Sequence, residues 1–251
     1  MAAHYDTYDY PAYWKGRDYE HRAEMEAIKS FLQIIPKIDS ILEIGAGYGR
    51  LIPSYSFRGK KILVSDPSAK LLSIAQNKFR QRKFKFLHSR LENLPRSLKK
   101  DSFDLIICVR VIHHIENSDK FFEIINNLLK NRGFLILEFA NKKHFKASIS
   151  QIFKGNFTFP LDIFPSDKRS SKSIKNRSIP FLNYHPDVFK EKLTEFGFNI
   201  IECRSVSNIR SSKIKNLIPA ETLLNLEKWL QIPLSYINFG PSIFVLAQKR
   251  I

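Results

Sequence analysis

Residues 40–50 read Ser-Ile-Leu-Glu-Ile-Gly-Ala-Gly-Tyr-Gly-Arg, and this run decides the fold. The mostly apolar residues 40–44 predict a short buried strand, and the residues after the run show the spacing of a helix. Between the two stand Gly45, Gly47 and Gly49. A strand that ends in glycines and leads into a helix leaves a nucleotide-sized space at the helix N-terminus, because a side chain there would keep a ligand away from the backbone.

The spacing of these glycines distinguishes between nucleotide ligands. The dinucleotide fingerprint needs glycine at positions 45, 47 and 50, and Arg50 stands at the last of them, which argues against a nicotinamide-dependent oxidoreductase. With Glu43 included, the run reads Glu-x-Gly-x-Gly-x-Gly. This pattern resembles motif I of the class I S-adenosylmethionine-dependent methyltransferases, within the group of methyltransferase domains 11 and 25.

The composition is that of a soluble globular domain. The chain of 251 residues is long enough for one substantial core, and no apolar run reaches the roughly 18–20 residues that span a bilayer. Residues 1–10 are polar and aromatic, so we expect no secretory signal. Cys108 and Cys203 lie in apolar segments, which favours buried thiols and a cytoplasmic location.

The net charge of +17 suggests an anionic partner such as a nucleic acid, a phosphorylated compound or a membrane surface. Residues 141–180 hold nine Lys or Arg against Asp162 and Asp167. The rest of the excess is scattered over the predicted helices. We therefore favour a generally lysine-rich solvated surface, with a basic patch at 141–180 as the alternative.

Strands and helices alternate in the first half of the chain, after an aromatic-rich arm over residues 1–20. The strands are apolar without alternation, which predicts a parallel sheet covered on both faces. The predicted strands are residues 41–44, 61–65, 84–87, 103–109 and 134–139, and the predicted helices are residues 18–35, 50–56, 68–79 and 117–130.

The alternation stops after residue 140. Residues 141–182 are basic, carry prolines and interleaved phenylalanines, and show no clear periodicity, which is typical of a functional lid or a disordered loop. The pattern resumes with a helix at 186–196, a strand at 198–203, a helix at 219–230 and a last strand at 242–247.

The resemblance implies a Rossmann-like, doubly wound α/β fold. Its seven-stranded sheet has the order 3-2-1-4-5-7-6, with strand 7 antiparallel. We expect a single methyltransferase domain over residues 1–251. Its parts would be an N-terminal aromatic arm and helix (1–36), a cofactor-binding core (40–140), a lid-like insertion (141–182) and the C-terminal part of the sheet (183–251).

The resemblance also places the cofactor, S-adenosylmethionine, against the glycine-rich run. The backbone of Gly45, Ala46 and Gly47 would lie along its ribose and methionine parts. Glu43 would polarise the site or hold water near the sulfonium. The alternative for Glu43 is an ion pair with a lysine.

A second acidic residue is expected to bind the ribose. Asp66 ends the second strand, 21 residues after Gly45, and a carboxylate at that spacing can accept hydrogen bonds from both ribose hydroxyls. Pro67, directly after it, is included with it among the cofactor-binding residues. The alternative is that Asp66 caps the helix that begins at Ser68.

The adenine site departs from the family pattern. Relatives typically read Asp-x-x-x-Leu-Pro after the third strand, and Arg90 stands here in place of that aspartate. We expect the Leu91 backbone and apolar walls to hold the adenine, with Glu92 as the alternative.

Two adjacent histidines are the candidate catalytic residues. Residues 103–114 read Phe-Asp-Leu-Ile-Ile-Cys-Val-Arg-Val-Ile-His-His, which resembles the family's Phe-Asp-x-apolar strand followed by Leu-His-His. Ligands collect at the carboxyl end of such a sheet, so His113 and His114 are candidates for a general base. The alternative is that a histidine packs beneath the next helix. No metal site is predicted.

The aromatic arm is expected to close the cofactor pocket. Tyr13, Trp14 and Arg17 precede a helix that relatives place over the methionine tail of the cofactor, so Arg17 would pair with its carboxylate. The alternative packs the arm on the outer face of the sheet.

These features predict methyl transfer by in-line displacement to a small-molecule or lipid-like acceptor. The strand end near residue 109 lacks the Asp/Asn-Pro-Pro-Tyr run of adenine amino-methyltransferases, and the chain has no Pro-Cys pair of the kind that cytosine C5 enzymes need. The alternative is a non-catalytic or RNA-docking protein with a methyltransferase fold. The sequence predicts neither the acceptor's identity nor the oligomeric state.

Overall fold

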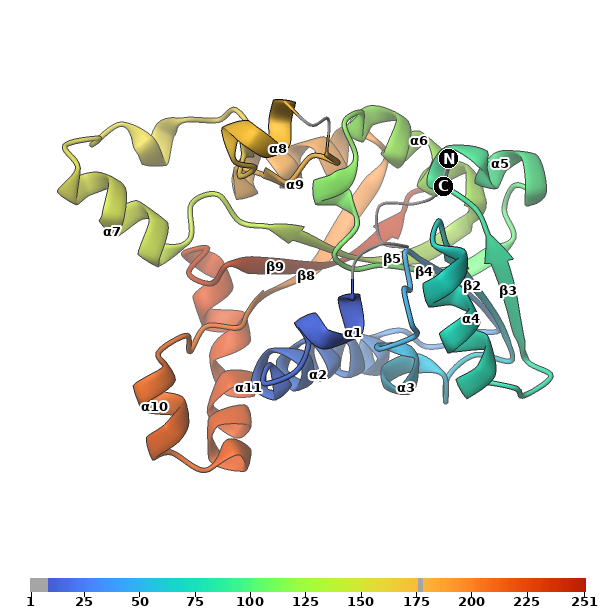
Figure 1. Ribbon diagram of the computed structural model, residues 1–251. Coiled ribbons are helices and arrows are strands. Elements are labelled where there is room, and N and C mark those ends of the chain that lie inside the picture. The colour runs from blue at the N-terminus through green and yellow to red at the C-terminus, as the bar shows by residue number, and fades with distance from the viewer. Residues whose placement is uncertain (1–8, 176–177) are drawn as a thin grey trace.

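A seven-stranded sheet forms the centre of the molecule, in the order β3-β2-β1-β4-β5-β9-β8 (Figure 1). The computed structural model describes residues 9–175 and 178–251. The strands are β1 Ser40–Ile44, β2 Lys61–Asp66, β3 Phe84–His88, β4 Phe103–Cys108, β5 Leu129–Ala140, β8 Phe198–Val206 and β9 Ser242–Lys249. Strand β9 runs antiparallel to both of its neighbours, and the other pairs are parallel. The predicted fold class, strand order and antiparallel last strand are confirmed.

Helices cover both faces of this sheet. Figure 1 shows α2 (Asp18–Ile34), α3 (Ile52–Tyr55) and α11 (Ala220–Tyr236) on one side, and α6 (Ser118–Leu128) and α9 (Pro186–Glu195) on the other. Each side buries its own apolar cluster against the strands. Because both strand faces are buried, the strands lack the alternation of apolar and polar residues that a half-exposed sheet shows.

Local signals place most helix ends correctly. The hydroxyl of Ser68 accepts from the backbone N–H of Leu71 and starts α4 (Ala69–Lys78), as predicted. Helix α2 ends before Pro36, also as predicted. Outside the insertion, three short helices were not foreseen: α1 (Tyr10–Tyr13), α5 (Leu94–Ser97) and α10 (Ser212–Leu217).

The helix predicted over 117–130 is too long. It ends at Leu128, because Leu129 is already extended and pairs with Phe103 of β4. Residues 131–133, directly after the predicted helix, lie inside β5, where Arg132 has a φ of +60° and the register between β4 and β5 shifts. The apolar spacing continues past the true end of the helix, so it could not mark that end.

The 141–182 insertion has regular structure, which its sequence did not indicate. It contains α7 (Phe145–Phe153), α8 (Ser171–Lys175) and a small antiparallel pair of β6 (Ser166–Asp167) and β7 (Leu182–Asn183). Its two ends meet at a bridge between Asn141 and Tyr184. The buried ammonium of Lys142 holds the loop between α7 and β6 by donating to the carbonyls of Asp162 and Phe164.

The described part of the aromatic arm lies beside the glycine-rich loop, where the ring of Tyr10 packs against Tyr48. Tyr10 and Tyr13 lie in α1 with stacked rings, and the indole of Trp14 contacts Tyr10 edge to face. Tyr5 and Tyr8, which belong to the predicted arm, lie outside the described residues. Among the described helices, none is both long enough and apolar enough to cross a membrane.

Candidate functional site

A cavity of about 220 Å³ opens at the carboxyl ends of β1, β2 and β4. Its walls come from the glycine-rich loop, the ends of the first three strands, the arm and the turn after β4. The lining residues are Tyr10, Ile44, Gly45, Gly47, Asp66, Pro67, Leu71, Ser89, Arg90, Leu91, Glu92, Arg110, Val111, His114, Ile115 and Ile179. The cavity lies where open α/β sheets bind ligands.

The glycine-rich loop needs glycine for both conformation and space. Gly45 has a φ of +70° and Gly47 a φ of +57°, a region that favours glycine. A Cβ on Gly45 would lie 2.2 Å from Cγ2 of Val111. Gly45 and Gly47 line the cavity, whereas Ala46 does not and instead donates its N–H to the carbonyl of Ser65.

Gly45→Ala is expected to weaken cofactor binding at least tenfold, because the new methyl would displace Val111 into the cavity. Gly155→Ala is the matched control: Gly155 also has a positive φ, +79°, but no atom lies within 4 Å of the position that its new methyl would take. Both variants bear a similar backbone cost of about 1 kcal/mol. Calorimetric titration with S-adenosylmethionine compares them, and equal affinities would contradict the prediction.

Asp66 lies at the centre of the cavity wall, almost fully buried. Its two carboxylate oxygens accept from the N–H of Gly47 and the N–H of Ser68, each at 2.7 Å. The carboxylate therefore ties the glycine-rich loop to the start of α4. Pro67 also lines the cavity. The contact with Ser68 agrees with the capping alternative, and binding of a ribose by Asp66 stays a prediction.

Glu43 lies away from the cavity, on the face of β1 that packs against α3. Its buried carboxyl accepts a hydrogen bond from the hydroxyl of Tyr55 and not, as the alternative had it, from a lysine. Burial raises the pKa of Glu43 to about 7, although the Tyr55 hydrogen bond and the charge of Arg50 act to lower it.

The stability of the protein is expected to fall as the pH rises from about 4.5 to about 7, in part because of Glu43. In that window the folded form holds a proton that the unfolded chain has released, since the pKa of Glu43 is raised from 4.5 to about 7 on folding. The contribution is at most about 1.4 kcal/mol per pH unit. Glu43→Gln keeps an acceptor for Tyr55 and removes this slope. Urea unfolding of the wild type and of the Glu43→Gln variant at several pH values measures how the free energy of unfolding depends on pH. Parallel pH dependences of the two proteins would refute the prediction.

The predicted adenine residues do come together at the cavity. Leu91 begins a short 3₁₀ turn after β3 and is nearly buried, and Arg90 and Glu92 on either side of it also line the wall. The Arg90 position that departs from the family pattern is thus part of the cavity. Whether the base contacts Leu91 stays a prediction.

The arginine predicted to bind the cofactor does not line the cavity. The guanidinium of Arg17 stacks on the ring of Tyr13, with its Cζ 4.2 Å from the ring centroid. Arg110, directly after β4, lines the cavity instead. Its φ of +60° turns the chain sharply at the strand end. The sequence carried one signal for Arg110, its place at the carboxyl end of a predicted parallel strand.

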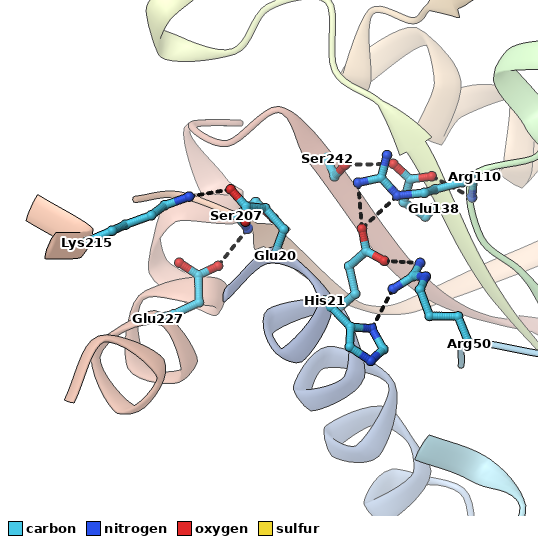
Figure 2. Close-up of polar contacts among 10 residues, drawn as sticks. Glu20, His21, Arg50, Arg110, Glu138, Ser207, Lys215, Glu227 and Ser242 are labelled. Carbon is cyan, nitrogen blue, oxygen red and sulfur yellow. Dashed lines mark hydrogen bonds and ion pairs between the residues drawn. The ribbon is translucent and has the colours of Figure 1, made fainter. Parts of the chain in front are cut away.

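Two buried carboxylates hold Arg110 in place (Figure 2). Glu24 of α2 accepts from its guanidinium at 2.8 Å and also pairs with Arg50, and Glu138 of β5 accepts from its backbone N–H at 2.9 Å. Burial alone would raise the pKa of Glu24, but the charges of Arg110 and Arg50 hold it below its ordinary value. The arm closes over this cluster, since both guanidiniums lie over the ring of Trp14.

A second cavity, of about 320 Å³, adjoins the first. The two share four lining residues from the arm, the turn after β4, the 3₁₀ turn and the insertion: Tyr10, Arg110, His114 and Ile179. The second is also lined by Tyr13, His113, Arg169, Ser173, Ser178 and Phe181. The insertion therefore forms one wall of a space that opens onto the first cavity.

The two histidines differ in their surroundings. His113 is buried against His114 and Phe181, and burial lowers the pKa of His113 well below its ordinary range. The Nδ1 atom of His114 lies 2.7 Å from the carbonyl of Pro180. A carbonyl only accepts, so Nδ1 of His114 carries the proton and Nε2 is the basic nitrogen of the neutral ring. No cluster of metal-ligating side chains occurs within residues 9–175 and 178–251.

Comparison with known proteins agrees with this geometry. Residues 42–137 match the methyltransferase domain family. The mitochondrial ubiquinone biosynthesis O-methyltransferase of Dictyostelium discoideum is 25% identical over 177 residues, covering 66% of this chain and 50% of the relative. An uncharacterised protein of Methanocaldococcus jannaschii is 30% identical over 151 residues, covering 60% of this chain and 61% of the relative. The matched region thus spans only about half to three fifths of these two relatives.

A solved structure shares the architecture. Magnesium protoporphyrin IX methyltransferase of Synechocystis, crystallised with bound SAH, superposes with a TM-score of 0.56 at 19% identity, covering 92% of this chain and 83% of that one. The family match and the fold together identify S-adenosylmethionine as the cofactor. Residues 42–137 therefore match the methyltransferase domain family, and the chain has the fold of the class I S-adenosylmethionine-dependent methyltransferases.

Proposed function

We propose that this protein transfers a methyl group from S-adenosylmethionine to a hydroxyl group of a small, lipophilic acceptor. The observation that carries the proposal is the pair of adjoining cavities, which share Arg110 and His114. The first has the glycine-rich bend and the carboxylate that suit the cofactor. The second has the apolar and cationic walls that suit an apolar acceptor with an anionic or polar group. The relative from Dictyostelium, an O-methyltransferase of ubiquinone biosynthesis by name, supports a hydroxyl acceptor.

The first cavity fits the cofactor in shape and charge. A methyl on Gly45 would clash with the side chain of Val111, so glycine is needed there to keep both the loop and Val111 in their places on the cavity wall. Asp66 would hold the ribose and Leu91 the adenine. Arg110, rather than Arg17, would face the carboxylate of the methionine tail, because Arg110 lies on the cavity wall and is held there by Glu24.

The sulfonium of the bound cofactor supplies an already activated methyl group. The protein therefore mainly aligns the acceptor and excludes water. His114 is the better candidate for a general base, because it lines both cavities and its Nε2 is the basic nitrogen. His113 lines only the second cavity, and its lowered pKa makes it a weak base. The cytoplasmic location stays a prediction.

Transfer of a labelled methyl group tests the proposal. The protein is incubated with methyl-labelled S-adenosylmethionine and a cell extract, and the labelled products are separated by mass and polarity. We expect a labelled apolar compound of low molecular mass. His114→Gln is expected to lower the turnover at least a hundredfold while cofactor affinity, measured by calorimetry, stays within twofold. Cofactor binding without any labelled product would favour the non-catalytic alternative, and label in RNA would exclude a small acceptor.

A further inference from the structure

The outer surface of the insertion exposes an unusual number of large apolar side chains. Phe153 is 87% exposed, Leu161 78% and Phe164 73%. The full set over residues 145–164 is Phe145, Ile149, Ile152, Phe153, Phe157, Leu161, Ile163 and Phe164, here called the insertion surface. Helix α7 buries none of its residues completely. An apolar set of this kind on one segment marks a contact with another molecule or with a membrane.

Exposed lysines lie within the insertion surface and in the residues that follow it. The side chains of five lysines are exposed there and form no ion pair within the described residues: Lys146, Lys154, Lys168, Lys172 and Lys175. The two acidic residues of the segment are already neutralised, Asp162 by Lys142 and Asp167 by Arg169. Residues 145–175 therefore combine exposed apolar side chains with lysines that no acidic residue of this segment balances.

We propose that the insertion surface docks on an anionic lipid bilayer. Phenylalanine and aliphatic side chains would enter the acyl boundary, and the lysines would face the anionic headgroups. The aliphatic members favour lipid over RNA, because bases stack on aromatic faces and gain little from Ile149, Ile152 or Leu161. The unbalanced charge disfavours a second copy of the chain, since two such surfaces would bring lysines against lysines.

The same insertion also forms a wall of the second cavity. Ile179 and Phe181 line that cavity after α8, at the other end of the segment. Docking would thus hold the acceptor cavity next to the bilayer, from which a lipophilic acceptor could enter. This role in acceptor supply rests on the proposed function, whereas the docking itself does not.

Co-sedimentation with lipid vesicles tests the docking. The 251-residue chain is mixed in 0.1 M salt with vesicles of phosphatidylcholine, either alone or with 30% phosphatidylglycerol. We expect at least tenfold stronger partitioning to the anionic vesicles. The double variant F153S/F157S is expected to lose at least tenfold of that partitioning, whereas F57S, which changes a 64% exposed phenylalanine outside the insertion, should lose less than twofold.

Two matched charge variants show whether vesicle binding depends on the lysines of the insertion or only on the net charge of the protein. K146E/K154E and K99E/K100E change the net charge equally, and all four lysines are exposed. Only K146E/K154E should weaken vesicle binding at least tenfold. Equal effects of the two pairs, binding to RNA but not to vesicles, or a dimer that buries Phe153 would each overturn the proposal. Calorimetry with S-adenosylmethionine is run in parallel, so that loss of vesicle binding is distinguished from failure of the methyltransferase assignment.

Discussion

Glu24→Gln is expected to lower the free energy of unfolding by about 3–5 kcal/mol. The carboxylate of Glu24 is completely buried between the guanidiniums of Arg50 and Arg110. Removing its charge leaves two cations close together without a counter-charge, and a neutral amide cannot accept from both in the same way. Urea denaturation followed by circular dichroism measures the change.

Glu26→Gln is the control for this prediction, because it alters the same helix two residues further on. Glu26 pairs with Lys29 at the surface, where both side chains are partly exposed. Such a pair contributes about 0–1 kcal/mol. Equal destabilisation by the two substitutions would show that Arg50 and Arg110 do not depend on Glu24. The Glu24 variant should also weaken cofactor binding, since Arg110 loses its anchor.

Asp66→Asn is expected to weaken S-adenosylmethionine binding roughly a hundredfold, or about 2.8 kcal/mol. The substitution keeps the shape of the side chain but removes the charge that would accept from the ribose hydroxyls, and hydrogen bonds to charged groups are the strong ones. It also leaves only one acceptor oxygen for the N–H groups of Gly47 and Ser68. Calorimetric titration measures the affinity, and thermal unfolding without cofactor measures the fold.

Ser68→Ala separates the two interpretations of Asp66. It removes the hydroxyl that accepts from Leu71 and so costs about 1 kcal/mol of stability at the start of the same helix. It should leave the affinity for the cofactor within twofold to threefold. If Asp66→Asn behaves in the same way, with lower stability and unchanged affinity, Asp66 is a capping residue and the ribose assignment fails.

The sheet could be predicted because its signals are local. Apolar strands, the glycines after residue 44 and the Ser68 cap each depend on a few neighbouring residues, and the resemblance supplied the strand order. The end of α6 could not be predicted, because Leu129 leaves the helix to pair with Phe103, a contact between separate strands. Helix α7 was also missed, although Phe145, Ile149 and Ile152 recur at helical spacing, because the prolines and charges around it hid this short pattern.

The same distinction between local signals and long-range contacts decides which residues of the candidate site could be predicted. Gly45, Asp66 and Leu91 reach the cavity because strand ends place them there, and strand ends are visible in a sequence. Arg110, and not the predicted Arg17, lines the cavity. Arg110 is held there by Glu24, which lies 86 residues away in the sequence, and no local pattern reveals that pairing. Glu43 shows the opposite problem. It belongs to the motif, yet the side of β1 on which it lies directs it to Tyr55 and away from the cavity.

The joined ends of the insertion make it a separable module. Backbone hydrogen bonds link Tyr184 to Ala140 and Lys142, so the chain leaves the sheet and re-enters it at adjacent points. The entropy of closing a loop grows only slowly with its length, so longer or shorter replacements would cost the fold little. A different segment could therefore be grafted at this junction. On the proposed function, such a graft would change the acceptor while the cavity at the glycine-rich loop stays as it is.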